Sequence, residues 1–333
     1  MDLSRRTLLA TASAASAAAL LGVPGTVSPA AAQSAPAGRQ APGFYRYKVG
    51  ELEVTAVTDG ANPGKLSDTF VRNQPFDQVK AELGQIYPSL ESGQSITVVT
   101  PVVVNAGTKL VAIDTGVGPG AVAGTKGALG LYHMHLEAAG IDRNAVDTVI
   151  ISHFHPDHIG GLLTTDNKPA FPKAEILVPE PEWSFWMDDA KMNAMPEGAR
   201  GAFQNARRVF GALGKNVTQY QADKELVPGI RSVFTPGHTP GHMSHILSSG
   251  SGRALIQADV TAGPALLFVR NPGWHMMFDA DGALAEQTRR KLYDMAVAEK
   301  MLVQGYHFPF PGAGHIEKTG DGYRLHPAVW RPM

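Results

Sequence analysis

Three histidines and an aspartate lie within six consecutive positions of this 333-residue chain, and no packing requirement explains that density. The cluster has the spacing H-x-H-x-D-H and consists of His153, His155, Asp157 and His158. Neutral imidazole and carboxylate are the nitrogen and oxygen ligands that Zn²⁺ and similar ions take. In an extended segment the first two histidines point the same way, whereas the other two residues follow a proline that forces a turn. The spacing therefore favours a metal site, with a histidine-rich polar loop as the alternative, and allows each half to face its own ion.

An apolar run ends shortly before the first cluster, and later apolar runs likewise end shortly before a ligand-type residue. Loops that leave one rim of a packed sheet can bring such residues together although they are far apart in the chain. We therefore expect the residues after these runs to converge on the first cluster. The run Val146–Ile151 precedes the first cluster, Ile230–Phe234 precedes His238, Ala254–Ile256 precedes Asp259, and Met301–Val303 precedes His307.

The rest of the chain has the pattern of an α/β protein. Residues Phe44–Asp59 alternate apolar and polar side chains, as a half-buried hairpin does. Two β-branched runs, Ile96–Val104 and Leu110–Ile113, flank a turn signal. Helical patterns between the strands predict a layered architecture with sheets inside and helices outside. The predicted helices are Leu129–Ala139, Trp183–Met187, Ala199–Leu213 and Leu284–Glu299.

Composition narrows the function further. Cysteine is absent, which excludes disulfides, thiolate ligands and a cysteine nucleophile, so that any metal must be held by His, Asp and Glu. The formal net charge of −1 offers no general attraction to nucleic acid or to anionic lipid. We therefore expect a small-molecule partner, and neither nucleic-acid binding nor stable membrane association.

Residues 1–32 have the pattern of a signal peptide. Arg5 and Arg6 are followed by an Ala- and Leu-rich run and by the small-x-small cleavage site Ala30-Ala31-Ala32. The twin arginines resemble those of Tat substrates, with an ordinary Sec signal as the alternative. We expect export through the Tat route to the periplasm or beyond. Residues 33–43 are predicted to form a linker, and residues 44–333 a single folded domain.

The ligand-type residues resemble the metallo-β-lactamase superfamily. The H-x-H-x-D-H cluster, the strand that ends in Asp114-Thr115-Gly116, the loop of sequence TPGHTPGH, Asp259 and His307 all occur in the order of that superfamily. The resemblance covers about residues 44–333 and implies an α/β fold, the four-layer αββα sandwich, with the site along one edge of the two sheets. Within the superfamily the chain is similar to methyl parathion hydrolase-like and lactonase-type enzymes. The stretches that carry this likeness are Asn271–Trp274, Phe278-Asp279, Thr288–Arg290 and Tyr306–Gly312, whereas Leu266–Val269 departs from it.

This resemblance implies a dinuclear hydrolase with two divalent ions, of which Zn²⁺ is the first choice and Mn, Fe or Co are alternatives. A hydroxide shared by the two ions would attack a carbonyl carbon or a phosphorus atom. Asp157 would also orient the nucleophile or shuttle a proton, and Asp114 would steady the histidines from behind. The implied ligands are His153, His155 and His238 for one ion, Asp157, His158 and His307 for the other, and Asp259 as the bridge.

Aromatic and methionine side chains near the ligand loops can build an apolar pocket. We expect Trp183, Phe268 and Trp274 to line it. No cluster of Lys or Arg lies on these loops, so a neutral ester, lactone or phosphotriester fits better than a polyanion. The remaining histidines are expected to cap, to pack in the core or to face solvent. They are His133, His135, His242, His245, His275, His315 and His326.

Several functions remain open at this point. A dinuclear hydrolase acting on lactones or organophosphate triesters fits best. A β-lactamase usually lacks the bridging aspartate, and Asp259 argues against it. An oxidative enzyme on the same fold would keep a single iron, and a binding protein on an inactive scaffold would lack ligands, whereas all seven positions are filled here. Relatives of this kind also suggest a homodimer.

Overall fold

The computed structural model describes residues 40–332, of which Ala41 onward belongs to one compact unit, Ala41–Met333. The signal peptide predicted at residues 1–32 lies outside the described residues, as does most of the predicted linker. Within the described part of the chain, no helix has both the length and the apolar character needed to cross a membrane.

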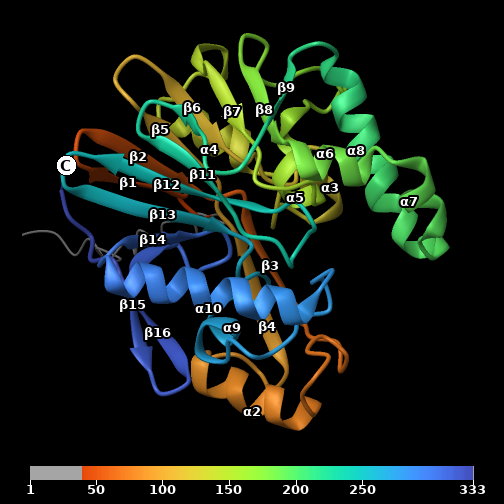
Figure 1. Cartoon of the computed structure of the whole chain (residues 1–333), viewed down its shortest axis with the longest axis vertical. Helices are drawn as coiled ribbons and strands as arrows, with labels where there is room; N and C mark the ends of the chain where they lie inside the picture. Colours follow the sequence, from red (N-terminus) through yellow and green to blue (C-terminus); the bar gives the residue numbers. More distant parts are fainter. Residues whose placement is uncertain (1–39, 333) are drawn as a thin grey trace, which may run out of the picture. The chain divides into compact units, whose positions relative to one another are not determined.

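Two seven-stranded sheets form the centre of this unit (Figure 1). The first has the order β1-β2-β5-β6-β7-β8-β9, and the second runs in sequence order from β10 to β16. The first sheet consists of β1 (Phe44–Val49), β2 (Leu52–Val57), β5 (Val102–Asn105), β6 (Leu110–Ile113), β7 (Thr148–Ile150), β8 (Glu175–Pro179) and β9 (Val217–Tyr220). The second consists of β10 (Glu225–Val227), β11 (Ile230–Phe234), β12 (Met243–Ser249), β13 (Gly252–Ala258), β14 (Leu302–Gly305), β15 (Ala313–Thr319) and β16 (Gly322–Pro327).

Helices cover the outer face of each sheet, as Figure 1 shows for α8 in green and α10 in blue. The first sheet is covered by α4, α5, α6 and α8, and the second by α9 and α10. The fold is therefore the predicted four-layer αββα sandwich. The helices are α2 (Phe76–Ile86), α3 (Ala121–Gly124), α4 (Tyr132–Ala138), α5 (Pro156–Ile159), α6 (Glu180–Trp186), α7 (Asp189–Ala194), α8 (Arg200–Leu213), α9 (Leu266–Arg270) and α10 (Gly282–Ala298).

The layers follow from the two-residue period of the strands. Val149 and Ile151 point toward the helices on the outer face of the first sheet, whereas Ile150 between them points toward the second sheet. In β13, Leu255 faces the outer helices, while its neighbours Ala254 and Ile256 face the first sheet. Strands with apolar residues on both faces are buried on both sides, so a helix layer must cover each sheet.

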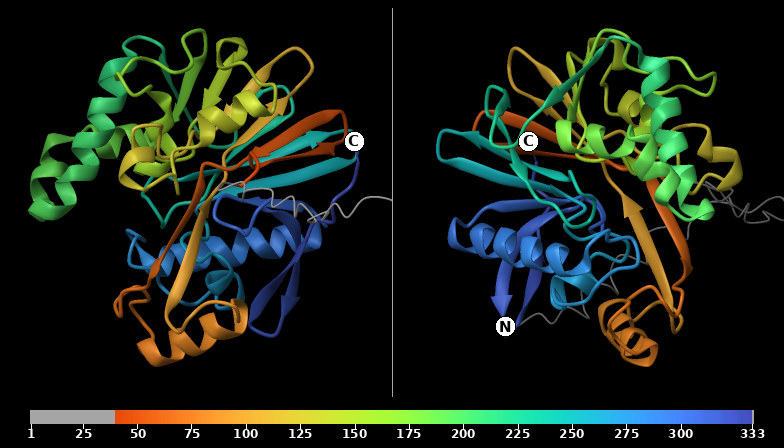
Figure 2. Two further views of the ribbon diagram at one scale, coloured as in Figure 1. Left: turned by 180° about the vertical axis from the view of Figure 1, so that it is seen from behind. Right: turned by 45° about the vertical axis from the view of Figure 1, so that its right-hand side comes forward.

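The hairpin predicted at Phe44–Asp59 is confirmed, because β1 and β2 pair antiparallel across a turn at Gly50. The prediction of one continuous run at Ile96–Val104 is wrong. The chain breaks at Thr100-Pro101, since proline cannot donate to a sheet ladder. The first half becomes β4 (Gln94–Val99), which pairs with β3 (Gly60–Lys65) in a separate two-stranded sheet. These two strands run together toward α2 in Figure 2.

Parallel pairing of strands determines at which edge of the sheets the candidate site residues lie. Strands β6, β7 and β8 are parallel to one another, and so are β13 and β14. The carboxyl ends of these strands therefore open at the same edge of each sheet. Asp114 follows β6, the H-x-H-x-D-H cluster follows β7, Asp259 follows β13 and His307 follows β14. His238 comes after the antiparallel strand β11.

Candidate metal centre

The structure brings all seven predicted ligand residues into two adjacent groups. Each residue of a group offers one ligand atom within 4.8 Å of the others. The two groups share the edge at which β7, β13 and β14 end. The first group is His153, His155, His238 and Asp259, and the second is Asp157, His158 and His307.

Three ring nitrogens of the first group converge. His155 Nδ1 lies 3.1 Å from His153 Nε2 and 2.9 Å from His238 Nε2. A tetrahedral ion with Zn–N bonds of 2.0–2.1 Å would place its ligand atoms about 3.3 Å apart. These spacings are therefore close to those of a tetrahedral zinc site. Asp259 Oδ2 lies 3.3 Å from His238 Nε2 and 4.0 Å from His153 Nε2.

The second group meets the first at Asp259. Asp259 Oδ1 lies 3.2 Å from His158 Nε2, and Asp259 Oδ2 lies 3.2 Å from His307 Nε2. Asp157 Oδ2 lies 3.8 Å from His158 Nε2 and 3.5 Å from His307 Nε2. One carboxylate thus contacts ligand-type nitrogens of both groups, as the bridging role predicted for it requires.

Two buried polar atoms at this place have no hydrogen-bond partner within residues 40–332. They are His158 Nε2 and Asp259 Oδ1, and both face the centre of the cluster. A buried polar atom without a partner costs about 1–3 kcal/mol, more when it is charged. Metal ligation would satisfy both atoms, and nitrogen and carboxylate donors without sulfur suit Zn²⁺, Mn²⁺ or Fe²⁺. The residues present therefore fit a pair of divalent ions.

The electrostatics of the cluster also favour positive charge at its centre. Burial lowers the pKa of His153 well below its usual range and that of His155 to about 3, so both rings keep a free lone pair at neutral pH. Although burial opposes it, hydrogen bonds to two aspartates raise the pKa of His238 to about 9. Against the same opposition from burial, neighbouring histidines hold the pKa of Asp259 well below its usual range. A buried carboxylate that stays ionised needs its charge compensated, and a metal ion beside Asp259 would do so.

Asp114 lies behind the second group, where the sequence predicts it. Its side chain accepts hydrogen bonds from the backbone N–H of Ser152 at 2.8 Å and from Ser152 Oγ at 2.7 Å. His158 Nδ1 lies 2.8 Å from Asp114 Oδ2, which leaves His158 Nε2 to face the cluster. Asp114 has a φ of 59°, a left-handed conformation that Asp adopts more readily than most residues.

A second carboxylate, Asp279, supports the first group. His238 Nδ1 lies 3.0 Å from Asp279 Oδ1, and the fully buried Arg289 of α10 approaches Asp279 Oδ2 at 3.6 Å. Arg289 also donates to the carbonyls of Val260, at 2.9 Å, and Pro272, at 2.7 Å. The sequence places both residues in stretches typical of the family, but nothing in the residue pattern assigns them this contact.

A cavity of about 940 Å³ opens on the ligands of both groups. Five ligand residues line it, and most of its remaining wall is apolar. Phe70 and Phe278 pack edge to face on one side, with ring centroids 6.0 Å apart. Phe185, Trp186 and Phe203 form another part of the wall, contributed by α6 and α8.

The three pocket residues predicted from the sequence do not line this cavity. Trp183 turns toward Phe210 of α8, with ring centroids 5.6 Å apart, because the helical period directs its neighbours Phe185 and Trp186 to the cavity instead. Phe268 is fully buried in the core between α2 and α9, and Trp274 belongs to the same core. The residue types were correct for such a wall, but the side chains that form it are different ones.

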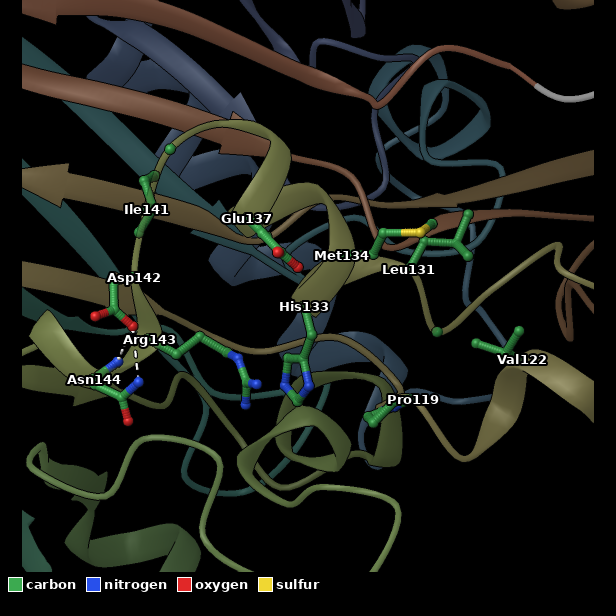
Figure 3. A pocket seen from close by; sticks show the side chains of 12 residues that line it. Pro119, Val122, Leu131, His133, Met134, Glu137, Ile141, Asp142, Arg143 and Asn144 are labelled. Atoms are coloured by element: carbon green, nitrogen blue, oxygen red, sulfur yellow. Dashed lines mark hydrogen bonds between the residues drawn. The ribbon is translucent and has the colours of Figure 1, made fainter.

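The other histidines have the structural roles predicted for them. His133 Nε2 lies 2.7 Å from the carbonyl of Gly161, and His135 Nδ1 lies 2.7 Å from the carbonyl of Thr58. Figure 3 shows His133 beside Arg143 in a second cavity, of about 740 Å³, on the outer side of α4. His242 Nε2 accepts a hydrogen bond from the backbone N–H of Asp259 at 3.0 Å, and so helps to position Asp259 without joining either group.

Two glycines allow the ligand loops to pack closely. A Cβ atom at Gly161 would lie 1.9 Å from the carbonyl oxygen of Thr115, and one at Gly241 would lie 2.3 Å from the backbone nitrogen of Glu182. Both contacts are with backbone atoms, whose displacement in a close-packed interior would destabilise the fold. The Gly-Gly pair behind the H-x-H-x-D-H cluster and the second glycine of the TPGHTPGH loop are therefore packing requirements of the site.

Comparison with known families and structures agrees with this geometry. Residues 95–304 match the family described as the metallo-beta-lactamase superfamily. An N-acyl homoserine lactonase from Bacillus sp. is 28% identical over 169 residues, which are 50% of this chain and 58% of that protein. An N-acyl homoserine lactonase from Bacillus cereus is 28% identical over 46% of this chain and 53% of that protein. The matches thus span little more than half of the length of these two relatives.

Solved structures match over a larger share of the chain. A hydrolase of the beta-lactamase superfamily, AbOPH, superposes with a TM-score of 0.78 and 27% identity, covering 88% of this chain and 100% of that one. AidC, a dizinc quorum-quenching lactonase in complex with its N-hexanoyl-L-homoserine product, superposes with a TM-score of 0.79 and 25% identity, covering 87% and 99%.

Proposed function

The chain belongs to the metallo-β-lactamase superfamily and has the His/Asp site of a zinc-type hydrolase, and we propose that it opens lactones that carry an apolar acyl chain. The single observation that carries this proposal is the apolar cavity that opens on both ligand groups. A neutral ester with a hydrocarbon tail can place its carbonyl at the ligands and its tail against the aromatic wall.

The seven ligand residues would hold two divalent ions, with Asp259 between them. When bound, such a pair supplies Lewis acidity toward a carbonyl oxygen and lowers the pKa of a coordinated water toward neutrality. The residues behind the ligands keep the imidazoles oriented, as Asp114 does for His158 and Asp279 does for His238. The side chains of Phe185, Trp186 and Phe203 exclude water from the region that the acyl chain would occupy.

Asp157 is the carboxylate best placed to handle a proton. Its side chain is 29% exposed, whereas that of Asp259 is 4% exposed. It also lines the cavity, so that it can exchange a proton with a leaving group or with solvent. We propose that Asp157 orients the nucleophile or passes its proton to the departing alkoxide.

The lactone class is favoured over a phosphotriester by the relatives. The curated relatives and AidC are lactonases, and AidC binds the ring-opened product of such a substrate. An organophosphate triester is the second candidate, because it is also neutral and apolar and fits the same wall. A β-lactam is disfavoured because Asp259 occupies the bridging position in this chain.

The test compares substrates on the purified, zinc-loaded protein. The panel contains homoserine lactones with acyl chains of increasing length, a paraoxon-type triester and the β-lactam nitrocefin. We expect kcat/KM to be highest for the lactones and to rise with chain length, by up to about fourfold for each CH₂ that the wall buries. Elemental analysis on the same sample should find two equivalents of metal.

The other outcomes identify the alternatives. Fastest turnover of nitrocefin would indicate a β-lactamase, and fastest turnover of the triester would indicate an organophosphate hydrolase. A single equivalent of iron together with oxidative turnover would contradict the dinuclear hydrolase. Two bound ions without turnover of any of these substrates would leave the hydrolase assignment in place but refute the substrate class.

A further inference from the structure

Glu182 is a fully buried carboxylate that connects two ligand loops. Its Oε2 accepts a hydrogen bond from the backbone N–H of Phe154 at 3.0 Å, and its Oε1 accepts one from the backbone N–H of Gly241 at 2.7 Å. Phe154 lies between His153 and His155, whereas Gly241 lies in the loop that carries His238. The two loops are 83 residues apart at His155 and His238, and one side chain of α6 holds both.

Burial raises the pKa of Glu182 above its usual range, whereas the N–H groups that donate to its two oxygens favour the ionised form. A third N–H group, Nε1 of Trp186, also donates to Oε2, at 2.6 Å. Among the described residues, no Lys or Arg forms an ion pair with Glu182, so its charge is compensated by these N–H donors. The close approach of Gly241 to the start of α6 brings the second loop within reach. A carboxylate offers acceptor lone pairs on both oxygens, which suits the three donors that converge here.

The same carboxylate also connects the ligands to the cavity wall. Trp186, which donates to Glu182, lines the cavity and packs edge to face on His155 with ring centroids 6.0 Å apart. Among the described residues, Glu182 makes no hydrogen bond to Asp157, His158 or His307. Its backbone hydrogen bonds lie in the loops that carry ligands of the first group, at Phe154 and at Gly241.

We propose that Glu182 is a positioning residue that holds the loop of His153 and His155 against the loop of His238, and so sets the geometry of the three-histidine group. The inference rests on the proposed metal centre. It assigns to Glu182 neither contact with the substrate nor contact with an ion. Without the hydrogen bonds of Glu182, the ring nitrogens of the three histidines no longer converge on one point. The second group keeps its own hydrogen bonds, from His158 to Asp114 and from His307 to the backbone carbonyl of Val98.

The test is Glu182→Gln, with Glu180→Gln as the matched control. A glutamine amide at position 182 can accept on one side only, so that its NH₂ group faces the N–H of at least one loop in either orientation. Glu180 is an exposed residue of the same helix, so the control makes the same chemical change away from the site. Zinc affinity of each metal-free variant is measured by competition with a chelator, with circular dichroism to confirm folding.

We expect Glu182→Gln to bind one zinc ion about 10–100-fold more weakly than the wild-type protein, and the other with nearly unchanged affinity. Glu180→Gln should bind both as the wild type does. The Co²⁺-loaded Glu182→Gln protein should show the visible spectrum of His153→Ala when only its tighter site is filled. Wild-type affinity for both ions, or equal weakening of both, would overturn the proposal.

A second variant covers the case in which Glu182→Gln does not fold. Glu182→Asp keeps the charge but is shorter by about 1.5 Å, and cannot reach both loops. Loss of one ion in this variant supports the proposal, and wild-type binding refutes it. Failure of the wild-type protein to bind two ions would instead refute the proposed function, so the two failures are distinguishable.

Discussion

At the scale of single residues, His153 and Asp259 are the side chains on which the proposed activity depends most. Replacing either one, as His153→Ala or Asp259→Asn, removes a ligand atom from the shared edge of the two groups. Supporting residues of metal sites typically contribute 10–100-fold to activity, so loss of a ligand should lower kcat/KM by more than about 100-fold. Turnover of a lactone, metal content and circular dichroism are measured together.

His326→Ala is the matched control for these ligand variants. The side chain of His326 is exposed and forms a surface ion pair with Glu317, at 2.7 Å. Its replacement should leave turnover and metal content unchanged. Wild-type turnover in His153→Ala or Asp259→Asn would rule out the two-ion mechanism.

The pH dependence of stability is a second prediction at this scale. Burial lowers the pKa of His133 to about 4, from about 6.5 in an unfolded chain. Between these two pKa values, His133 is protonated in the unfolded chain but not in the folded protein. The free energy of unfolding therefore decreases as the pH falls. The contribution is intact above pH 6.5, and up to about 3 kcal/mol is lost toward pH 4.

This effect is measured by urea unfolding of the metal-free protein and of His133→Gln at a series of pH values. The variant lacks the titrating group, so the wild type should lose more stability than the variant between pH 6.5 and 4. Parallel curves for the two proteins would show that His133 does not carry this dependence.

At the scale of elements, helix α10 is coupled to the ligand loops through one buried cation. Arg289→Met removes the buried guanidinium from beside Asp279, which still contacts His238, and removes the donor to the carbonyls of Val260, Pro272 and Trp274. Breaking a buried ion pair by removing one partner typically costs 3–5 kcal/mol, and we expect a decrease of about this size in the free energy of unfolding. Urea unfolding measures it.

The neighbouring Arg290 provides the control for this prediction. Arg290 lies on the same turn of α10 as Arg289. It forms surface ion pairs with Glu286, at 2.9 Å, and with Asp321, at 3.0 Å. Exposed pairs contribute about 0–1 kcal/mol, so Arg290→Met should have a small effect. Equal losses in the two variants would mean that burial of the Arg289 pair is unimportant.

At the scale of the whole molecule, metal binding and folding should be linked. The residues of the two ligand groups come from both sheets. His153 follows β7 of the first sheet, whereas Asp259 and His307 follow β13 and β14 of the second. An ion that binds only the folded protein raises the free energy of unfolding by about 2.7 kcal/mol per site at 100 times its Kd. We expect EDTA to lower the midpoint of thermal unfolding and Zn²⁺ to restore it.

Calorimetry with increasing Zn²⁺ measures this linkage, and elemental analysis of the reloaded protein should find two equivalents. A midpoint that does not respond to EDTA, or a limit of one equivalent, would contradict the dinuclear site.

Export concerns the part of the chain outside the described residues. Because Arg5 and Arg6 carry the Tat-type pattern, we propose that replacing both by lysine leaves the protein unexported. Cell fractionation with immunodetection measures this, and a single replacement such as Asp2→Asn serves as a control that should be exported. Normal export of the double variant would remove the Tat assignment. The homodimer expected from relatives likewise stays a prediction.

Part of the structure follows from the sequence because the relevant signals are local. The two-residue alternation in Phe44–Asp59 predicts the first hairpin, and ligand chemistry at H-x-H-x-D-H spacing predicts a metal site without any knowledge of the fold. The apolar runs before His238, Asp259 and His307 predict strands that end at the same edge. These predictions use only residues that are close to one another in the sequence, so no knowledge of the tertiary structure is needed.

Other features were decided only by tertiary packing. Which aromatic residues line the cavity depends on how α6 is rotated against α8, so that Trp186 faces the ligands whereas Trp183 faces the core. Glu182 and Asp279 also contact residues far away in the chain, since Gly241 is 59 residues from Glu182 and His238 is 41 residues from Asp279. These loops meet only after the two sheets have packed. Residue type, spacing and period determined which side chains could bind metal. The packing of the layers decided which others hold them in place, because a contact between distant loops leaves no trace in local sequence.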